Sequence, residues 1–340
     1  MVKNKLKILF IAFLTLVIFL VVGGFLIFQE MSSFVKEPFK SSAKGKIFSI
    51  KPGQSLTVIA QNLETESIIS NKIYFKLFTK YKKAAKKLQA GEYILSASKS
   101  PEQILEIFLK GKVKLYRITI PEGLNIKEIA FLVEAVDFCK KQEFIDLCHD
   151  KVLIESLKIP SISLEGYLFP DTYFFPGKTD CKSVITTMVA HFNNIFTKEW
   201  QEQAKSMGFS IHQIVTLASI IEKETGDAKE RPLISSVFHN RLKKKMRLES
   251  DPTTIYGIKN FDGNIKRQHL KMVTPYNTYQ IKGLPLGPIA NPGAKSLGAA
   301  LNPSHSEYLF FVSKKDTTHQ FSKTIQEHNN AVKRYQLRKK

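Results

Sequence analysis

The most constraining feature of this 340-residue chain is an uncharged segment close to its amino terminus. Residues 8–28 read ILFIAFLTLVIFLVVGGFLIF, and a helix of this length spans the roughly 30 Å hydrocarbon core of a bilayer. A cleaved signal peptide is the alternative, but its apolar region is usually shorter and ends in a small-residue cleavage site, whereas Phe28-Gln29-Glu30-Met31 follows here. We therefore predict an uncleaved transmembrane helix that contacts membrane lipid.

The lysines in front of this segment predict its orientation. Lys3, Lys5 and Lys7 precede it, and positive charges flanking a span are retained in the cytoplasm. Residues 1–7 are therefore predicted to be a cytoplasmic tail, and the chain after residue 28 to lie outside the cytoplasm. The expected location is the cytoplasmic (inner) membrane, with a single pass and a periplasmic ectodomain.

The net charge of +21 at pH 7 narrows the class of partner. Such a field favours an anionic partner, which is nucleic acid, an anionic membrane face or an acidic polymer. The anchor puts nucleic acid out of reach, so we expect no nucleic-acid partner and assign the charge to envelope polymers or lipid head groups. The densest basic run, residues 241–247, is also typical of a solvated helix face, and that interpretation stays open.

Cys139, Cys148 and Cys181 make an odd number of cysteines in a compartment that oxidises thiols. Their spacing allows a bond between Cys139 and Cys148 but does not establish the pairing. The sequence contains no CxxC or HExxH pattern, so we expect neither a metal nor another cofactor.

Two segments share a weak repeat at a constant offset. Residues 49–63 read SIKPGQSLTVIAQNL and residues 119–133 read TIPEGLNIKEIAFLV, and each predicts a strand, a glycine turn and an amphipathic helix. The first copy resembles the opening of LysM domains, which bind N-acetylglucosamine-containing glycans, and residues 88–95 are its candidate closing strand. An ordinary strand-helix unit explains the same pattern, and both interpretations stay open.

A capping box, Ser210 with Gln213, predicts a helix that begins at Ile211. The apolar residues that follow form one stripe at about 100° per residue; Glu222 falls inside this stripe, and Glu224 lies on the other side, where it is expected to face water. Burial disfavours an ionised carboxylate, so we predict a raised pKa for Glu222, which suits a general acid in glycosidic cleavage. Pairing of Glu222 with a nearby cation or a backbone group is the alternative.

Three longer stretches carry a resemblance to a known family. They are residues 217–258, which include LASIIEKETG and DPTTIYGI, residues 274–303 and residues 319–332. With the amino-terminal arrangement, they resemble the endolytic murein transglycosylases of the MltG (YceG-like) family. In that family the first Glu of the E-K-E-T motif is the catalytic acid, which implies Glu222 here. His239 and Leu286 depart mildly from the family pattern, at positions that concern substrate contacts.

The resemblance implies a reaction without water. Such enzymes cleave the MurNAc–GlcNAc β-1,4 bond: the acid protonates the bridging oxygen and then accepts the proton of the MurNAc C6 hydroxyl, whose oxygen attacks C1 and leaves a 1,6-anhydro end. One carboxylate suffices, because the nucleophile is tethered within the sugar. The resemblance further implies that the substrate is nascent peptidoglycan glycan strands, that cleavage ends their elongation, and that peptidoglycan synthases are partners.

Polar and aromatic residues in the family-like stretches are the candidate substrate contacts, although braces for the loops around Glu222 would use the same chemistry. They are Asn240, Arg241, Asp251, Thr253, Tyr256, Tyr276, Asn277, Thr278 and Tyr279. Residues 283–293 predict a rigid loop that shapes the cleft, and residues 308–313 predict a core strand.

Two other functions fit the sequence. A hydrolase would use Glu249, Asp251 or Glu224 as the base that activates water. A non-catalytic, membrane-anchored peptidoglycan-binding scaffold would account for the LysM-like repeat and the basic surface. A penicillin-binding-type acyl enzyme is excluded, because residues 96–99 fit S-x-x-K but the chain has no K-T-G.

The expected fold class is α+β, with a mixed α/β YceG-like catalytic domain after a small LysM-like βα module. The aromatic segment 164–177 is expected near the start of the catalytic domain, either as a sugar-stacking loop or as core. The predicted divisions are residues 1–7 for the tail, 8–28 for the transmembrane helix, 29–46 for a polar linker, 47–133 for the LysM-like module and 134–340 for the catalytic domain.

Overall fold

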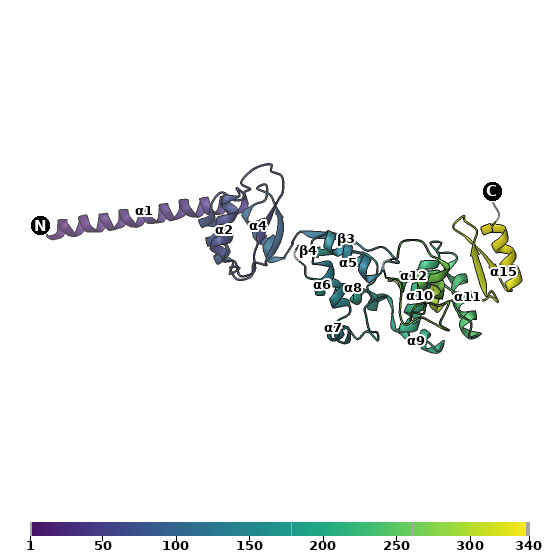
Figure 1. Ribbon diagram of the computed structural model, residues 1–340. Helices are drawn as coiled ribbons and strands as arrows, with labels where there is room; N and C mark the ends of the chain where they lie inside the picture. Colours follow the sequence, from purple (N-terminus) through teal and green to yellow (C-terminus); the bar gives the residue numbers. More distant parts are fainter. Residues whose placement is uncertain (1, 178, 260, 338–340) are drawn as a thin grey trace. The chain divides into compact units, whose positions relative to one another are not determined.

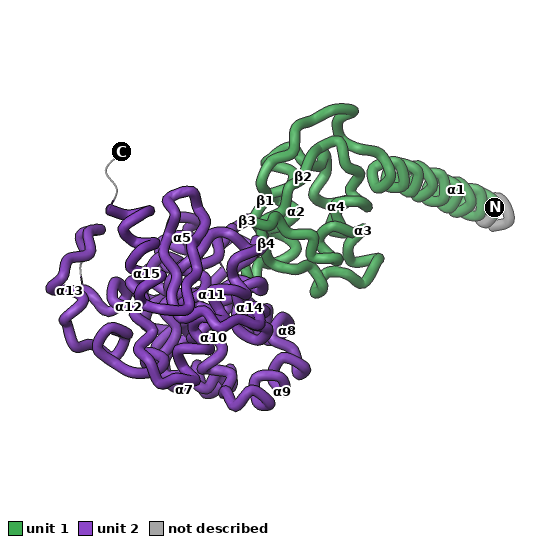
Figure 2. The backbone as a smooth tube through the Cα atoms, turned by 90° about the vertical axis from the view of Figure 1, so that its right-hand side faces the viewer, with its two compact units in different colours: residues 1–116 green, residues 117–340 purple. Residues whose placement is uncertain are grey.

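The structure of the chain, a computed structural model, describes residues 2–177, 179–259 and 261–337 (Figure 1). It divides into two compact units, unit 1 with residues 1–116 and unit 2 with residues 117–340 (Figure 2). This division falls earlier than the predicted boundary after residue 133. The reason is backbone pairing, because Ile120 N–H donates to Asp171 O at 2.9 Å and Gly123 N–H donates to Asn291 O at 2.9 Å, both within unit 2.

The elements alternate between helices and short strands. Unit 1 contains α1 (Val2–Lys36), β1 (Lys46–Ile50), α2 (Leu56–Thr65), α3 (Lys72–Tyr81), β2 (Gly91–Leu95) and α4 (Pro101–Leu109). Strand β3 (Leu115–Thr119) crosses the division, and unit 2 continues with α5 (Ile126–Ala135), α6 (Lys141–Cys148), α7 (Lys151–Ser156), β4 (Thr172–Pro176), α8 (Cys181–Ile195), α9 (Lys198–Ser206), α10 (Ile211–Glu224), α11 (Arg231–Lys243), α12 (Asp251–Tyr256), α13 (Arg267–Lys271), α14 (Ala294–Leu301), β5 (Phe310–Ser313), β6 (His319–Ser322), α15 (Ile325–Val332) and the π-helix η1 (Lys333–Leu337).

Helix α1 contains the predicted membrane span and continues past it. The helical segment 7–36 is long and apolar enough to cross a membrane, with a mean hydropathy of 2.9 in its most apolar window. The helix ends at Lys36, so the first residues of the predicted linker 29–46 are helical rather than irregular. The carboxyl-terminal end of α1 contacts α3 and α4, which joins the span directly to the packed part of unit 1.

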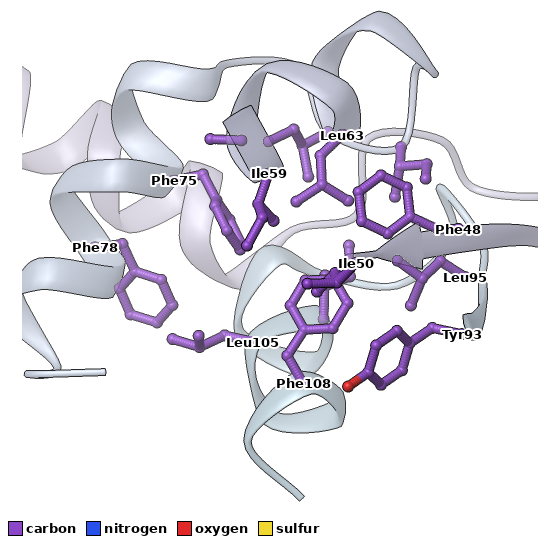
Figure 3. Close-up of a cluster of buried hydrophobic side chains, with 14 of the residues drawn as sticks. Phe48, Ile50, Ile59, Leu63, Phe75, Phe78, Tyr93, Leu95, Leu105 and Phe108 are labelled. Carbon is purple, nitrogen blue, oxygen red and sulfur yellow. The ribbon is translucent and has the colours of Figure 1, made fainter. Parts of the chain in front are cut away.

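The core of unit 1 lies between a two-stranded sheet and helices α2, α3 and α4 (Figure 3). Strands β1 and β2 pair antiparallel, with Phe48 opposite Tyr93. Both of these side chains point inward, while Ile47 and its partner Ile94 on the same strands are about half exposed, as the period of two in a strand requires. The predicted closing strand within residues 88–95 is therefore confirmed as β2.

The weak repeat corresponds to two copies of one local structure. Gly53 and Gly123 both adopt positive φ, 75° and 79°, a conformation that strongly favours glycine. In each copy a side chain two residues later caps the next helix: Ser55 accepts from Val58 N–H, and Asn125 forms a capping box with Glu128. The copies lie in different units, so the repeat does not delimit one module.

Helix α10 is the central helix of unit 2. Every residue from Ile214 to Ile221 is buried, and α14 packs along it. A helix that is buried on all sides carries no single apolar stripe, so the predicted stripe described only part of its packing. The start of the helix is as predicted, because the Ser210 and Gln213 capping box is present.

A disulfide joins α8 to the chain before α6. It links Cys139 to Cys181, with Cα atoms 5.4 Å apart, and Cys148 is a free, buried thiol. The pairing of Cys139 with Cys148 that the sequence allowed is therefore wrong. Cys148 lies at the end of α6, where burial raises the pKa of its thiol.

The aromatic segment 164–177 belongs to the core of unit 2. Tyr167 is fully buried and packs edge-to-face on Phe192 of α8, with ring centroids 5.0 Å apart. The core interpretation of this segment is therefore correct for Tyr167, and the same holds for Phe169, which is 7% exposed.

Candidate active site

The end of α10 places two carboxylates in different surroundings. The helix stops at Glu224, because Thr225 has an extended backbone with φ of −142°. Glu222 and Glu224 are two residues apart, about 200° around a helix, so they point away from each other. Their partners differ in charge and in chemistry.

Glu222 is held by a cation and by the backbone. Its side chain is 5% exposed, and its Oε1 lies 2.8 Å from Nη2 of Arg231 on α11. Gly293 N–H donates to Oε2 at 3.0 Å. The pairing alternative that the sequence left open for Glu222 is therefore the arrangement in the structure.

The contacts around Glu222 connect three segments of unit 2. Arg231 Nη2 also reaches Oε2 of Glu122 at 3.5 Å, so the guanidinium connects two carboxylates. An added Cβ at Gly293 would lie 1.9 Å from Glu122 Oε1, the end of a flexible, 45% exposed side chain that would have to move aside. These contacts fasten α10, α11 and the predicted loop 283–293 to one another, and they occupy both oxygens of Glu222.

Glu224, in contrast, lines a cavity of about 360 Å³. A cavity of this size is within the range of small-molecule and substrate sites. The other residues of its wall combine charged, hydroxyl and aromatic groups: Arg241, Leu248, Glu249, Asp251, Tyr279, Phe310, Phe311, Ile325 and His328. Among the described residues, Glu222 is not part of this wall.

The pKa of Glu224 is raised to about 7, chiefly by burial. The neighbouring charge of Asp251 acts in the same direction, while a hydrogen bond from Ser250 and the charge of Arg241 oppose the rise. Ser250 Oγ donates to Glu224 Oε1 at 2.5 Å. Glu224 was expected to face water; the residue is partly exposed and lines the cavity, and its surroundings give it a pKa suited to holding a proton near neutral pH.

Arg241 forms part of the cavity wall and also supports it. Its Nε donates to Leu309 O at 2.6 Å, and its Nη1 donates to Leu248 O at 3.0 Å and lies 3.2 Å from Glu249 Oε2. The guanidinium also lies over the ring of Phe310, 5.0 Å from its centroid. Arg241 therefore fixes the backbone on two sides of the cavity while keeping a positive charge near Glu224.

Asp251 and Tyr279 form a second polar pair on the wall. The Tyr279 hydroxyl donates to Asp251 Oδ1 at 2.8 Å, which holds the carboxylate in place at the start of α12. Both side chains belong to the predicted set, and the structure brings them together with Glu224 and Arg241 around one cavity.

The remaining predicted contacts serve as braces. Asn277 is fully buried, and its Nδ2 donates to Met272 O at 2.6 Å, while Thr253 and Thr278 share a hydrogen bond at 2.8 Å. Asn240 donates to the backbone oxygens of Ser306 and Tyr308. These side chains use their polar groups on the protein itself and hold the loops behind the cavity.

Tyr256 and Tyr276 pack on each other away from this cavity, with ring centroids 4.7 Å apart. The Tyr256 hydroxyl donates to Oε2 of Glu165 at 2.9 Å. Glu165 is 3% exposed and also accepts from Asn291 Nδ2 and from Ile126 N–H, and its burial raises its pKa to about 7. Sequence reasoning missed Glu165 as a second buried carboxyl, because its segment was dominated by aromatic residues.

Several residues of the cavity wall were also missed. The strand 308–313 was predicted to be core, yet Phe310 and Phe311 are only partly buried and face the cavity. Ile325 and His328 lie on α15, far from Glu224 in the sequence. Their only signal was membership of the family-like stretch 319–332, because nothing in their local pattern indicates which way they face.

Comparison with known proteins identifies the family. A model of the YceG-like family matches residues 48–334. A protein of Bacillus subtilis (strain 168) named endolytic murein transglycosylase is 33% identical over 336 residues, which cover 93% of this chain and 91% of that protein. Two Streptococcus pneumoniae proteins of the same name, from serotype 2 strain D39 and strain R6, are 29% identical over 341 residues, which cover 91% of this chain and 62% of their length.

A crystal structure of a YceG-like protein from Listeria monocytogenes is also similar. It has a TM-score of 0.59 and 34% sequence identity, and the match covers 84% of this chain and 98% of that one. The chain belongs to the YceG-like family. The predicted family is thus confirmed, and the curated relatives carry the name of the enzyme class that the sequence predicted.

Proposed function

We propose that the protein is a membrane-anchored endolytic peptidoglycan lytic transglycosylase, and that its catalytic acid is Glu224 rather than Glu222. The observation that carries the residue assignment is the position of Glu224 in the cavity, where burial raises its pKa to about 7 and its hydrogen-bond donor is a neutral hydroxyl. Glu222 has a guanidinium and a backbone N–H on its two oxygens and no place on the cavity wall. The relatives named endolytic murein transglycosylase support the reaction class.

In the proposed reaction, protonated Glu224 gives its proton to the bridging oxygen of a MurNAc–GlcNAc β-1,4 bond. The C1–O bond of MurNAc breaks, and the GlcNAc leaves with a C4 hydroxyl. The Glu224 carboxylate then takes the proton from the MurNAc C6 hydroxyl as that oxygen bonds to C1. The product is a 1,6-anhydro end, and Glu224 regains its proton without consuming water.

Other residues of the cavity wall can support proton transfer, stabilise the transition state and bind the sugar rings. Burial raises the pKa of Glu224 to about 7, and the opposite charges of Asp251 and Arg241 partly offset each other, so the group can both donate and accept a proton near neutral pH. A positive charge at the oxocarbenium centre of the transition state would be stabilised by Asp251. Phe311 and Tyr279 offer aromatic rings and a hydroxyl against which sugar rings can pack.

The amino-terminal unit fits an accessory role in the same proposal. Helix α1 would anchor the chain by a single pass in the cytoplasmic membrane, with unit 2 outside the cytoplasm and close to newly made glycan. The order strand, helix, helix, strand in residues 46–95 is compatible with a LysM-like glycan-binding module. Cleavage of newly made glycan close to the membrane would end strand elongation, and peptidoglycan synthases would be the partners in the membrane.

Product analysis of the full-length protein in detergent, acting on uncrosslinked peptidoglycan, tests the proposal. The expected products are strands whose ends are lighter by one water than the reducing ends of a hydrolase, as read by mass spectrometry. Reducing ends would instead favour hydrolysis with Asp251 or Glu249 as base, since both line the same cavity. Binding of glycan strands without any cleavage would favour the non-catalytic scaffold.

A further inference from the structure

Helix α3 of unit 1 carries an exposed apolar face. Ile73, Leu77 and Tyr81 are 59%, 50% and 78% exposed, and their spacing of four residues places them on one side of the helix. Phe75 and Phe78 lie on the opposite side and are buried in the core (Figure 3). Single exposed apolar residues are common in folded proteins, but three in a row on one helix form an unpartnered surface.

This face lies beside the end of α1 that leaves the predicted membrane span. The ring of Tyr74 contacts the ring of Phe34 at a centroid distance of 5.6 Å, and the nearby Glu30 carboxylate raises the pKa of the Tyr74 hydroxyl. At about 1.5 Å per residue, Glu30 and Phe34 are about 3 and 9 Å beyond Phe28, the last residue of the apolar segment. This is the depth of the lipid head-group layer, where tyrosine is enriched in membrane proteins.

The charge of the same segment matches a lipid surface. Residues 72–87 contain seven lysines and no acidic residue. Within the described chain, Lys72 pairs with Glu64 and Lys82 pairs with Glu102, which leaves five lysines of this segment without an ion pair. Lysines next to an apolar helix face extend toward anionic head groups while their aliphatic stems cover the acyl boundary.

We propose that α3 is an interfacial helix that docks on the extracytoplasmic surface of the membrane. Ile73, Leu77 and Tyr81 enter the acyl boundary, and the lysines of residues 72–87 bind anionic phospholipid head groups. This inference rests on the proposed membrane anchor α1. A protein partner or a glycan strand would not require the apolar face to adjoin the membrane exit of α1, whereas a lipid partner does.

Depth-dependent quenching in reconstituted vesicles tests this docking. Full-length protein is placed in phosphatidylcholine vesicles containing phosphatidylglycerol and lipids with a quencher on the acyl chain, and one cysteine carries an environment-sensitive fluorophore. Leu77→Cys reports on the docking face, and Ile94→Cys on β2 is the control of similar exposure, 55%. Cys139 and Cys181 are bonded and Cys148 is buried, so the added cysteine is the one labelled.

Docking predicts at least about twofold stronger quenching at Leu77→Cys than at Ile94→Cys, because an interfacial helix buries its apolar face about 5–10 Å into the head-group boundary. A label at Phe19→Cys, inside the apolar segment, reports on the anchor itself. Strong quenching at Phe19→Cys with equal quenching at Leu77→Cys and Ile94→Cys would overturn the docking and leave the anchor intact. Absence of quenching at Phe19→Cys would overturn the anchor.

A charge variant separates lipid docking from general proximity to the membrane. The substitutions Lys80→Glu, Lys83→Glu and Lys87→Glu change exposed residues, so circular dichroism of the variant should match that of the native chain. Quenching at Leu77→Cys should then fall to the level of Ile94→Cys in phosphatidylglycerol vesicles. Unchanged quenching in this variant, or equal quenching of the native chain with and without phosphatidylglycerol, would refute the role of anionic lipid.

Discussion

The carboxyl-terminal turn of α10 carries a carboxylate on each side, Glu222 and Glu224, and the groups that surround the two differ. On one side Glu222 is closed off by Arg231 and Gly293, which contact its two oxygens. On the other side Glu224 faces a cavity, with the Ser250 hydroxyl as donor and Asp251 nearby. Burial is common to both residues, so burial alone does not define a catalytic acid. The surroundings decide: Glu222 contacts a cation directly, whereas burial and the neighbouring Asp251 raise the pKa of Glu224 against the lowering effect of the Ser250 hydrogen bond.

Replacing each carboxylate by its amide gives the largest expected contrast. Glu224→Gln keeps the shape and the Ser250 contact but removes the transferable proton, so glycan cleavage should fall by about 10²–10⁴-fold. Glu222→Gln should retain most of the cleavage rate per folded molecule. Release of soluble fragments from peptidoglycan measures both. The opposite ranking, with Glu222→Gln inactive and Glu224→Gln active while both remain folded, would return the acid to Glu222.

The stability of the same two variants should rank the other way. Glu222→Gln removes the 2.8 Å carboxylate partner of the buried Arg231 guanidinium and leaves only Glu122 at 3.5 Å, so the free energy of unfolding should fall, by at most about 3–5 kcal/mol. Glu224→Gln should change it little at about pH 4.5 and below, where Glu224 is protonated, and should raise it near pH 7, because the amide cannot ionise. Denaturant unfolding measures both, and Glu222→Gln combined with Arg231→Gln should be less destabilising than the sum of the single changes. Equal losses of unfolding free energy in Glu222→Gln and Glu224→Gln would contradict the proposed difference between the two carboxylates.

The free energy of unfolding should depend on pH because acids with raised pKa values ionise as the pH rises. The pKa of Glu224 rises from 4.5 to about 7 on folding, so its protonated form is favoured in the folded state and its contribution is fully present below about pH 4.5. That contribution is lost as the pH rises through 7, by about 3 kcal/mol, because one pKa unit corresponds to about 1.4 kcal/mol. Chemical denaturation at pH 5 and pH 8 measures the loss, which Glu224→Gln should reduce.

Glu165 provides the matched control for this pH effect. Burial raises its pKa to about 7 as well, yet it lies among Tyr256, Asn291 and Ile126 rather than on the cavity wall. Glu165→Gln should therefore flatten the pH dependence of stability by a similar amount. The decline of cleavage above pH 7 should remain in Glu165→Gln, since that decline comes from Glu224. A cleavage profile that becomes flat in Glu165→Gln would contradict this separation.

The sequence predicted the local secondary structure well, but it predicted poorly which surroundings individual side chains face. The capping box of α10, the glycine turns at Gly53 and Gly123 and the strand at β2 follow from short-range rules, and the structure has them. The family motif assigned the acid to Glu222, whereas we propose Glu224. The motif carries no information on the contacts that separate the two residues, which come from Arg231 and Gly293 on one side and from β5 and α15 on the other.

The smallest expected effect concerns the hydroxyl that sets the acidity of Glu224. The hydrogen bond from Ser250 lowers the pKa of Glu224 against the larger effect of burial, so Ser250→Ala should raise that pKa further. The alkaline limb of the pH profile of cleavage should then move to higher pH by about one to two units, since a hydrogen bond to a charged group contributes about 1.5–3 kcal/mol and one pKa unit corresponds to about 1.4 kcal/mol. Cleavage rates measured from pH 5 to pH 9 show where the alkaline limb lies.

Thr278→Val is the control. Thr278 Oγ accepts from Ser250 N–H at 3.0 Å, so the substitution changes a contact of the same backbone but no contact of Glu224. A limb that moves to lower pH in Ser250→Ala would show that the group titrating in cleavage is not the carboxyl that Ser250 contacts.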